Sequence, residues 1–115
     1  MQIFIHTDRN IALTDAQREG FEQVLAGAVD RFDARLTRIE VHLSDVNSTR
    51  GGVSDKRCVL ETRPAGRQPF AVEHQAATIE LAVAGAGTKL QNVLESTFGR
   101  LDRVRGDSGG IASVE

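Results

Sequence analysis

Residues 36–44 read Leu-Thr-Arg-Ile-Glu-Val-His-Leu-Ser and carry the clearest strand signal in the chain. Every second side chain is apolar from Ile39 onward, which is the period of a strand with one buried face. We therefore expect a strand here whose buried face presents Ile39, Val41 and Leu43 and whose opposite face is polar.

Two elements are predicted before this strand. Residues 2–6 alternate in the same way and predict a first strand. Thr14 followed by Gln17 forms a capping box, and the apolar residues after it recur every three or four positions. This spacing predicts a helix from about Asp15 to Phe32.

Three further elements are predicted after it. Asp45 to Asp55 is rich in Gly, Ser and Asn and indicates a long hairpin loop. A third strand is expected over Lys56–Arg63 and a fourth over Pro69–Glu73, where proline is tolerated at the first position. The period then becomes helical, which predicts a second helix from about Ala76 to Leu101.

The element order is therefore β-α-β-β-β-α, an α+β fold with a four-stranded mixed sheet. The helical crossover favours a parallel pairing of the first two strands, and the short links favour antiparallel hairpins for the others. Both helices then cover one sheet face. We expect one domain over residues 1–105 and a disordered tail over 106–115, where no periodicity remains.

Composition narrows the class of protein. A chain of 115 residues has no room for a separate cofactor-binding domain. Its 14 Lys and Arg against 16 Asp and Glu give a net charge of −2, so any contact with nucleic acid must be local. One cysteine and the absence of a signal peptide or long apolar run predict a cytoplasmic protein without a membrane partner.

The chemistry-bearing residues do not predict an enzyme. Cys58 with His42 or His74 suggests a thiol nucleophile, because a cysteine needs a nearby base or cation to ionise. However, Cys58 shares a strand face with Leu60, whereas His42 belongs to the opposite face. We expect a buried, unreactive cysteine, no catalytic residues, no cofactor and no metal site.

The basic residues are unevenly distributed. Five of them lie between positions 50 and 67 against two acidic residues, so this segment is net +3: Arg50, Lys56, Arg57, Arg63 and Arg67. A second set aligns as a polar stripe on the second predicted helix: Lys89, Asn92, Ser96, Arg100 and Arg103. Both sets have two interpretations, a phosphate-binding surface or ordinary solvated charge.

Gly85 and Gly87 lie inside the second predicted helix. The pair indicates either close packing against a neighbouring element or a weak point in the helix, because glycine costs about 1 kcal/mol relative to alanine.

Several segments together resemble the short ribosome hibernation-promoting factor, or ribosome-associated inhibitor, family, also called sigma-54 modulation proteins. The resemblance covers about residues 1–103 and is carried by RIEVHLS (38–44), DKRC (55–58), GRQP (66–69), EHQAAT (73–78) and LESTFGRL (94–101).

The resemblance implies a fold like that of double-stranded-RNA-binding domains and a stress-response protein that binds the small ribosomal subunit and inhibits translation. The family's basic positions on the second helix correspond to Lys89 and Arg100. With the basic residues of the hairpin, the candidate contacts to 16S rRNA phosphates are Lys56, Arg57, Arg63, Lys89 and Arg100. No DNA partner is expected.

The alternative is a protein-interaction module. Phe4, Val59 and Ala71 alternate onto the sheet face opposite the helices and would leave that face partly apolar. A homodimer through this open face is one form of this alternative.

Overall fold

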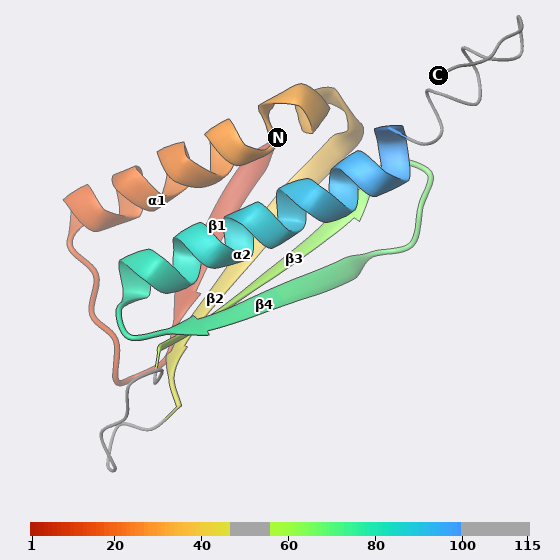
Figure 1. Cartoon of the computed structure of the whole chain (residues 1–115). Coiled ribbons are helices and arrows are strands. Elements are labelled where there is room, and N and C mark those ends of the chain that lie inside the picture. Colours follow the sequence, from red (N-terminus) through yellow and green to blue (C-terminus); the bar gives the residue numbers. More distant parts are fainter. Residues whose placement is uncertain (47–55, 100–115) are drawn as a thin grey trace, which may run out of the picture.

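The computed structural model describes residues 1–46 and 56–99 of the chain and has the predicted element order (Figure 1). The elements are β1 (Gln2–Thr7), α1 (Asp15–Ala28), the 3₁₀ helix η1 (Asp30–Arg35), β2 (Leu36–Asp45), β3 (Lys56–Pro64), β4 (Phe70–Ala76), α2 (Ile79–Leu94) and the π-helical turn η2 (Glu95–Gly99). The predicted tail, most of the predicted hairpin loop and the last two residues of the second predicted helix lie outside the described residues.

The four strands form one sheet in the order β1-β2-β3-β4. β1 pairs with β2 in parallel, and the other two pairings are antiparallel. Ile5 is the partner of Val41, which is in turn the partner of Leu60, so the apolar positions of three strands lie in one row. This register confirms the predicted mixed sheet.

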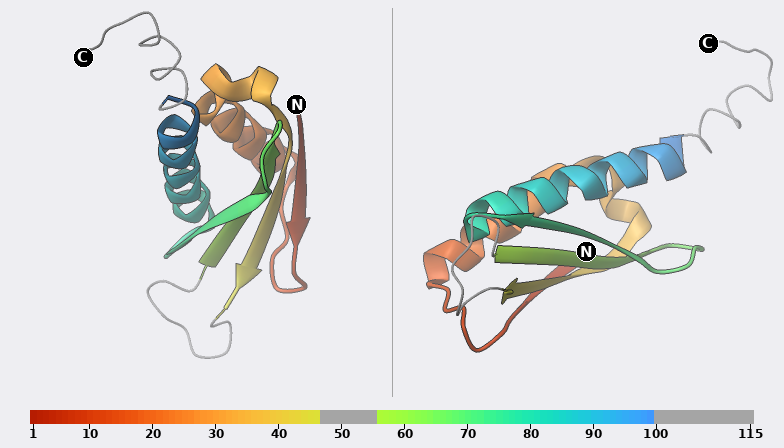
Figure 2. Two further views of the ribbon diagram at one scale, coloured as in Figure 1. Left: turned by 90° about the vertical axis from the view of Figure 1, so that its right-hand side faces the viewer. Right: turned by 60° about the horizontal axis from the view of Figure 1, so that its bottom comes forward.

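Both helices lie on one face of the sheet and leave the other face open (Figure 2). α2 packs on β3, β4 and α1, so it closes the core from above. The inward residues of β2 are buried as predicted, and the largest side chains that are fully buried around them include Leu25, Leu60, Leu90 and Leu94. Burying each such side chain contributes about 1.5–3 kcal/mol to folding.

The first helix begins where the sequence predicts and ends earlier. Thr14 Oγ1 accepts a hydrogen bond from Gln17 N at 3.0 Å, and Gln17 Oε1 accepts one from Thr14 N at 2.9 Å. The predicted end at Phe32 is wrong, because the α-helix stops at Ala28 and Phe32 belongs to η1. The tighter 3₁₀ turn still buries Phe32 while the chain reverses toward β2, so the apolar spacing continued past the helix end.

The junction between β4 and α2 also differs from the prediction. β4 begins at Phe70 rather than Pro69 and continues to Ala76, so α2 starts only at Ile79. Thr78 caps the helix by accepting a hydrogen bond from Leu81 N at 3.1 Å. The start predicted at Ala76 was wrong because the capping threonine, not the onset of apolar spacing, decides where the helix begins.

The two helix glycines are sites of close packing. A Cβ atom at Gly85 would overlap the imidazole ring of His74 on β4, and one at Gly87 would lie 3.4 Å from Leu25 Cδ2. Of the two interpretations of this pair, the structure supports close packing. Gly85 thus lets α2 lie directly on the histidine of the edge strand.

Candidate nucleic-acid interface

Two of the predicted contact residues lie at the start of β3 and face carboxylates. Lys56 Nζ lies 3.4 Å from Asp45 Oδ2 at the end of β2. Arg57 Nε pairs with the carboxylate of Glu73 on β4. A phosphate that binds either cation must therefore compete with an internal acid.

Lys89 extends from α2 to the edge strand. Its Nζ donates a hydrogen bond to the main-chain oxygen of Glu73 at 2.8 Å. Arg57 and Lys89 therefore meet at one residue, the first through its carboxylate and the second through its carbonyl. Along the predicted polar stripe, Lys89, Asn92 and Ser96 are exposed, whereas Arg100 and Arg103 lie outside the described residues.

Arg63 lies at the opposite end of β3. It comes seven positions after Lys56, which is about 23 Å along an extended strand. Its side chain is exposed and forms no ion pair within the part of the chain that the structure describes. The structure thus brings Lys56, Arg57 and Lys89 to one region and leaves Arg63 apart.

A second basic region lies beside Arg63 at this end of the sheet, and of the three further arginines in it only Arg67 belongs to the basic segment noted in the sequence. The rings of Phe32 and Phe98 stack with their centroids 5.9 Å apart. The guanidinium carbon of Arg35 lies 4.9 Å from the Phe98 centroid, that of Arg67 lies 5.8 Å from it, and that of Arg31 lies 5.2 Å from the Phe32 centroid. We call these five residues the arginine–phenylalanine cluster.

The cluster joins three segments that are distant in the sequence. Arg31, Phe32 and Arg35 come from η1, Arg67 from the turn between β3 and β4, and Phe98 from η2. Arg31 also pairs with Glu95 at 2.7 Å. The arginines on either side of Phe32 are the only sequence signal that could have indicated this cluster. Their partner Phe98 lies more than 60 residues away, and no local pattern connects it with them.

The open sheet face carries a histidine pair that sequence reasoning missed. The rings of His6 and His42 stack with centroids 5.0 Å apart on the parallel strands β1 and β2. His6 Nε2 lies 2.7 Å from Glu40 Oε1, and His42 Nε2 lies 3.0 Å from Glu61 Oε1. The prediction that His42 points away from the helices is confirmed.

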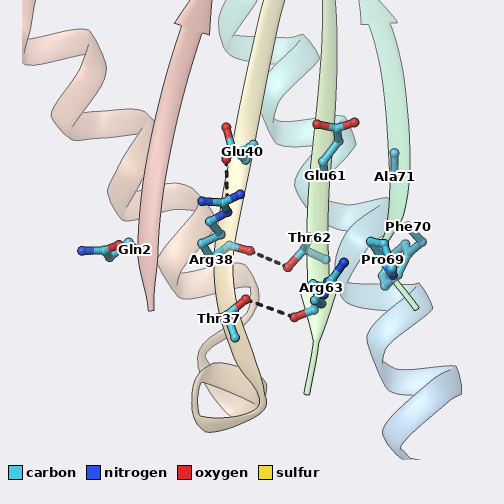
Figure 3. Close-up of a pocket in the computed structure, with 10 residues that line it drawn as sticks. All are labelled: Gln2, Thr37, Arg38, Glu40, Glu61, Thr62, Arg63, Pro69, Phe70 and Ala71. Atoms are coloured by element: carbon cyan, nitrogen blue, oxygen red, sulfur yellow. Dashed lines mark hydrogen bonds and ion pairs between the residues drawn. The ribbon is translucent and has the colours of Figure 1, made fainter. Parts of the chain in front are cut away.

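Glu40 is the centre of this charged row. The hydrogen bond from His6 lowers the pKa of the Glu40 carboxyl below its ordinary value, with a further contribution from the positive charge of Arg38, although partial desolvation opposes the shift. Arg38 Nε lies 3.1 Å from Glu40 Oε2. Figure 3 shows Arg38, Glu40 and Glu61 along the shallow groove of this face, with Arg63 at its lower end.

The apolar residues of the open face are separated from one another. Phe4 is 39% exposed and lies opposite Glu40 in the register. Val59 lies opposite His42, and Ala71 lies opposite Glu61. Each is therefore next to a polar or charged side chain, so these three residues form no continuous apolar surface.

Cys58 is buried, as predicted, and burial raises the pKa of its thiol to about 12. His74 lies directly opposite it on β4, but no hydrogen bond joins the two within the described residues. Thiolate formation needs a stabilising charge, so this arrangement is that of an unreactive core cysteine.

In residues 1–46 and 56–99, no three His, Cys, Asp or Glu side chains are grouped so that they could hold a metal ion. Over the same ranges, neither main helix is long and apolar enough to cross a lipid bilayer.

The fold and its exposed cations define a small two-helix, four-stranded α+β domain with two separate basic regions. Comparison with known families identifies the family: residues 4–102 match the sigma 54 modulation protein / S30EA ribosomal protein family, and the chain belongs to it. This is a family of ribosome-associated proteins. The match confirms the family expected from the sequence.

Solved structures show the same fold. The N-terminal domain of Protein Y from Thermus thermophilus is 25% identical, with a TM-score of 0.68 over 84% of this chain and 99% of that chain. A ribosomal subunit interface protein from Coxiella burnetii is 16% identical, with a TM-score of 0.68 over 86% of this chain and 99% of that one. A search of curated proteins finds no match.

Proposed function

We propose that this protein is a non-enzymatic, cytoplasmic factor that binds the small ribosomal subunit through rRNA phosphates and inhibits translation under stress, so that ribosomes hibernate. The observation that carries the proposal is the family match over residues 4–102, together with the fold shared with the Protein Y domain. The domain is small and its exposed cations occur in local groups, which suits a binding protein that uses electrostatic contacts.

The contacts proposed from the sequence are Lys56, Arg57, Arg63, Lys89 and Arg100. Their surroundings predict unequal contributions. Arg63 has no ion pair in the described ranges, so a phosphate that binds it competes with no internal carboxylate there. Lys89 gives up only a neutral carbonyl, whereas Arg57 must exchange one anion for another.

The direct test is cosedimentation of the purified protein with 30S subunits at low and moderate salt. We expect binding at low salt that weakens as salt rises, because phosphate contacts release counterions. Arg63→Ala should weaken binding more than Arg57→Ala does.

The matched control is Arg9→Ala, which removes one exposed arginine from the loop after β1 and should leave binding unchanged. Absence of cosedimentation at low salt would remove the proposal. A translation assay with added protein then tests inhibition separately from binding.

The alternative function, docking of a partner or a second copy on the open sheet face, is favoured by one observation, the exposed Phe4 on the edge strand β1. Light scattering at high concentration tests self-association: a Phe4-dependent dimer supports it, and a monomer without partners in pull-downs contradicts it.

A further inference from the structure

We infer that the end of the domain where η1, the β3–β4 turn and η2 meet is a preformed site for a backbone phosphate of RNA. Arg63 and Arg67 are its direct ligands. This inference rests on the proposed function: it adds Arg67 to Arg63, which the sequence already suggests as a contact, and it joins the two in one site. In Figure 1 this site is where the turn after β3 comes close to the C-terminal part of α2.

The first support is the hollow that the two arginines share. Its lining includes Arg63, Arg67, Gln68 and Thr97, and no carboxylate of residues 1–46 or 56–99 lines it. The guanidinium, amide and hydroxyl groups all can donate hydrogen bonds, which a phosphate accepts through its oxygens. The hollow therefore favours an anion over a cation.

The second support is the way in which Arg67 is held. Its guanidinium lies over the ring of Phe98, which is only 5% exposed and is contacted by Arg35 as well. A cation over an aromatic ring gains about 0.5–2 kcal/mol without losing its charge. A ring contact, unlike a carboxylate, leaves the arginine N–H groups free for bidentate binding of phosphate.

The third support is that the turn is fixed to η1. Ala65 N donates a hydrogen bond to Arg35 O at 2.7 Å, and Arg67 N donates one to Pro64 O at 3.0 Å. Gly66 adopts φ +73°, a conformation that glycine enters without steric cost. Because the backbone is already ordered, binding loses less conformational entropy than it would on a loose loop.

Among the residues that the structure describes, the nearby carboxylates do not line this hollow. Glu95 is paired with Arg31, whose guanidinium carbon lies 5.2 Å from the Phe32 centroid. Asp30 and Asp33 belong to η1 and are exposed, but neither lines the hollow. Arg63 and Arg67 form no ion pair in the described part of the chain.

The burial of the aromatic rings indicates which part of an RNA binds. Phe32 and Phe98 are both 5% exposed and stack on each other, so neither can stack on a base. The site therefore reads the backbone and not the sequence, which is how a shape-recognising RNA-binding domain positions itself.

The experiment measures the salt dependence of 30S binding for the full-length wild type, Arg63→Ala, Arg67→Ala and the double variant. Each lost phosphate contact should reduce the slope of log K against log salt by about 1, and the double variant should lose about 2. Arg9→Ala is the control with the same charge change and should keep the wild-type slope. Circular dichroism confirms that each variant is folded.

A second arm separates the site from the ribosome. Titration with inorganic phosphate, and separately with a short RNA duplex, is followed through the arginine Nε–H signals of the ¹⁵N-labelled protein. We expect shifts at Arg63 and Arg67 with both, at much lower concentration with the duplex.

The outcomes are distinguishable. If the wild type binds 30S subunits and the double variant keeps the wild-type slope, this inference is overturned and the proposed function stands. If the wild type does not bind 30S subunits, the proposed function fails, and the RNA-duplex arm decides the site: selective shifts at the two arginines support it, and their absence overturns it. Shifts with inorganic phosphate but none with the duplex would also overturn it, because the ligand would then not be RNA.

Discussion

The two ends of β3 hold their cations in different ways. At its start, Lys56 and Arg57 face the carboxylates of Asp45 and Glu73. At its other end, Arg63 has no ion pair in the described residues, and Arg67 in the turn that follows lies over the neutral ring of Phe98. A carboxylate cancels the charge it stabilises, whereas an aromatic ring holds a cation in place and leaves its charge for a ligand. Counting basic residues along the sequence does not distinguish these two cases.

The largest expected effect comes from removing the ring on which the arginine end depends. Phe98→Ala should destabilise the domain by about 3–5 kcal/mol, because it opens a cavity beside Phe32. Urea denaturation measures this loss. Phe98→Leu keeps most of the apolar volume without the ring, so it should lose less stability and still weaken 30S binding. Equal binding by folded Phe98→Leu and wild type would contradict a role for the ring in holding the arginines.

The next effect concerns α2, which carries Lys89 and continues into η2, the turn that carries Phe98. Gly85→Ala should cost about 1–3 kcal/mol, because the new methyl overlaps the His74 ring and forces α2 or β4 to move. His74→Ala in the same chain should recover part of this loss, and urea denaturation of the two single variants and the double variant gives the coupling. A gain in stability from Gly85→Ala alone, as helix propensity predicts, would contradict the close packing.

A smaller effect is expected at the carboxylate end. Glu73→Gln removes the anion beside Arg57 and keeps the carbonyl that accepts from Lys89. Stability should change by about 0–1 kcal/mol, because the pair is exposed. Affinity for 30S subunits should rise, because Arg57 no longer has to leave the Glu73 carboxylate in order to bind a phosphate. Glu19→Gln, on the exposed face of α1, makes the same charge change as a control. Unchanged affinity in Glu73→Gln would show that Arg57 does not contact RNA.

The smallest effect is a pH dependence on the open face. The pKa of Glu40 is lowered in the folded state, chiefly by the hydrogen bond from His6. The ionised Glu40 carboxylate therefore stabilises the fold at pH values above its unfolded-state pKa. This stabilisation is lost as pH falls through its folded-state pKa. The difference in urea midpoint between wild type and Glu40→Gln should shrink as pH is lowered from about 5 to about 3. A difference that grows toward acid pH would contradict the assignment.

The sequence predicted local features where one segment carries its own signal. The capping box of Thr14 and Gln17 gave the start of α1, and strict alternation gave β2. The same signals misplaced the end of α1 and the start of α2, because apolar spacing continues through a 3₁₀ turn and Ala76 extends a strand paired with Lys56. Both boundaries depend on partners elsewhere in the chain.

In the candidate site, too, the residues themselves could be predicted from the sequence, whereas their contacts with distant segments could not. Lys56, Arg57, Arg63 and Lys89 could be named from charge distribution and family resemblance. Their partners could not, because Glu73 comes to Arg57 only through strand pairing.

The amino-acid sequence alone determined the order of elements, the family and which segments carry positive charge, since hydrophobic period and composition are properties of neighbouring residues. Only the tertiary structure decided which of those charges remain available. Phe98 is brought to Arg35 and Arg67 by the packing of three segments, and His6 is brought to His42 by a parallel pairing across a helix. Coulombic and aromatic contacts depend on distance in space, and folding sets that distance independently of separation along the chain.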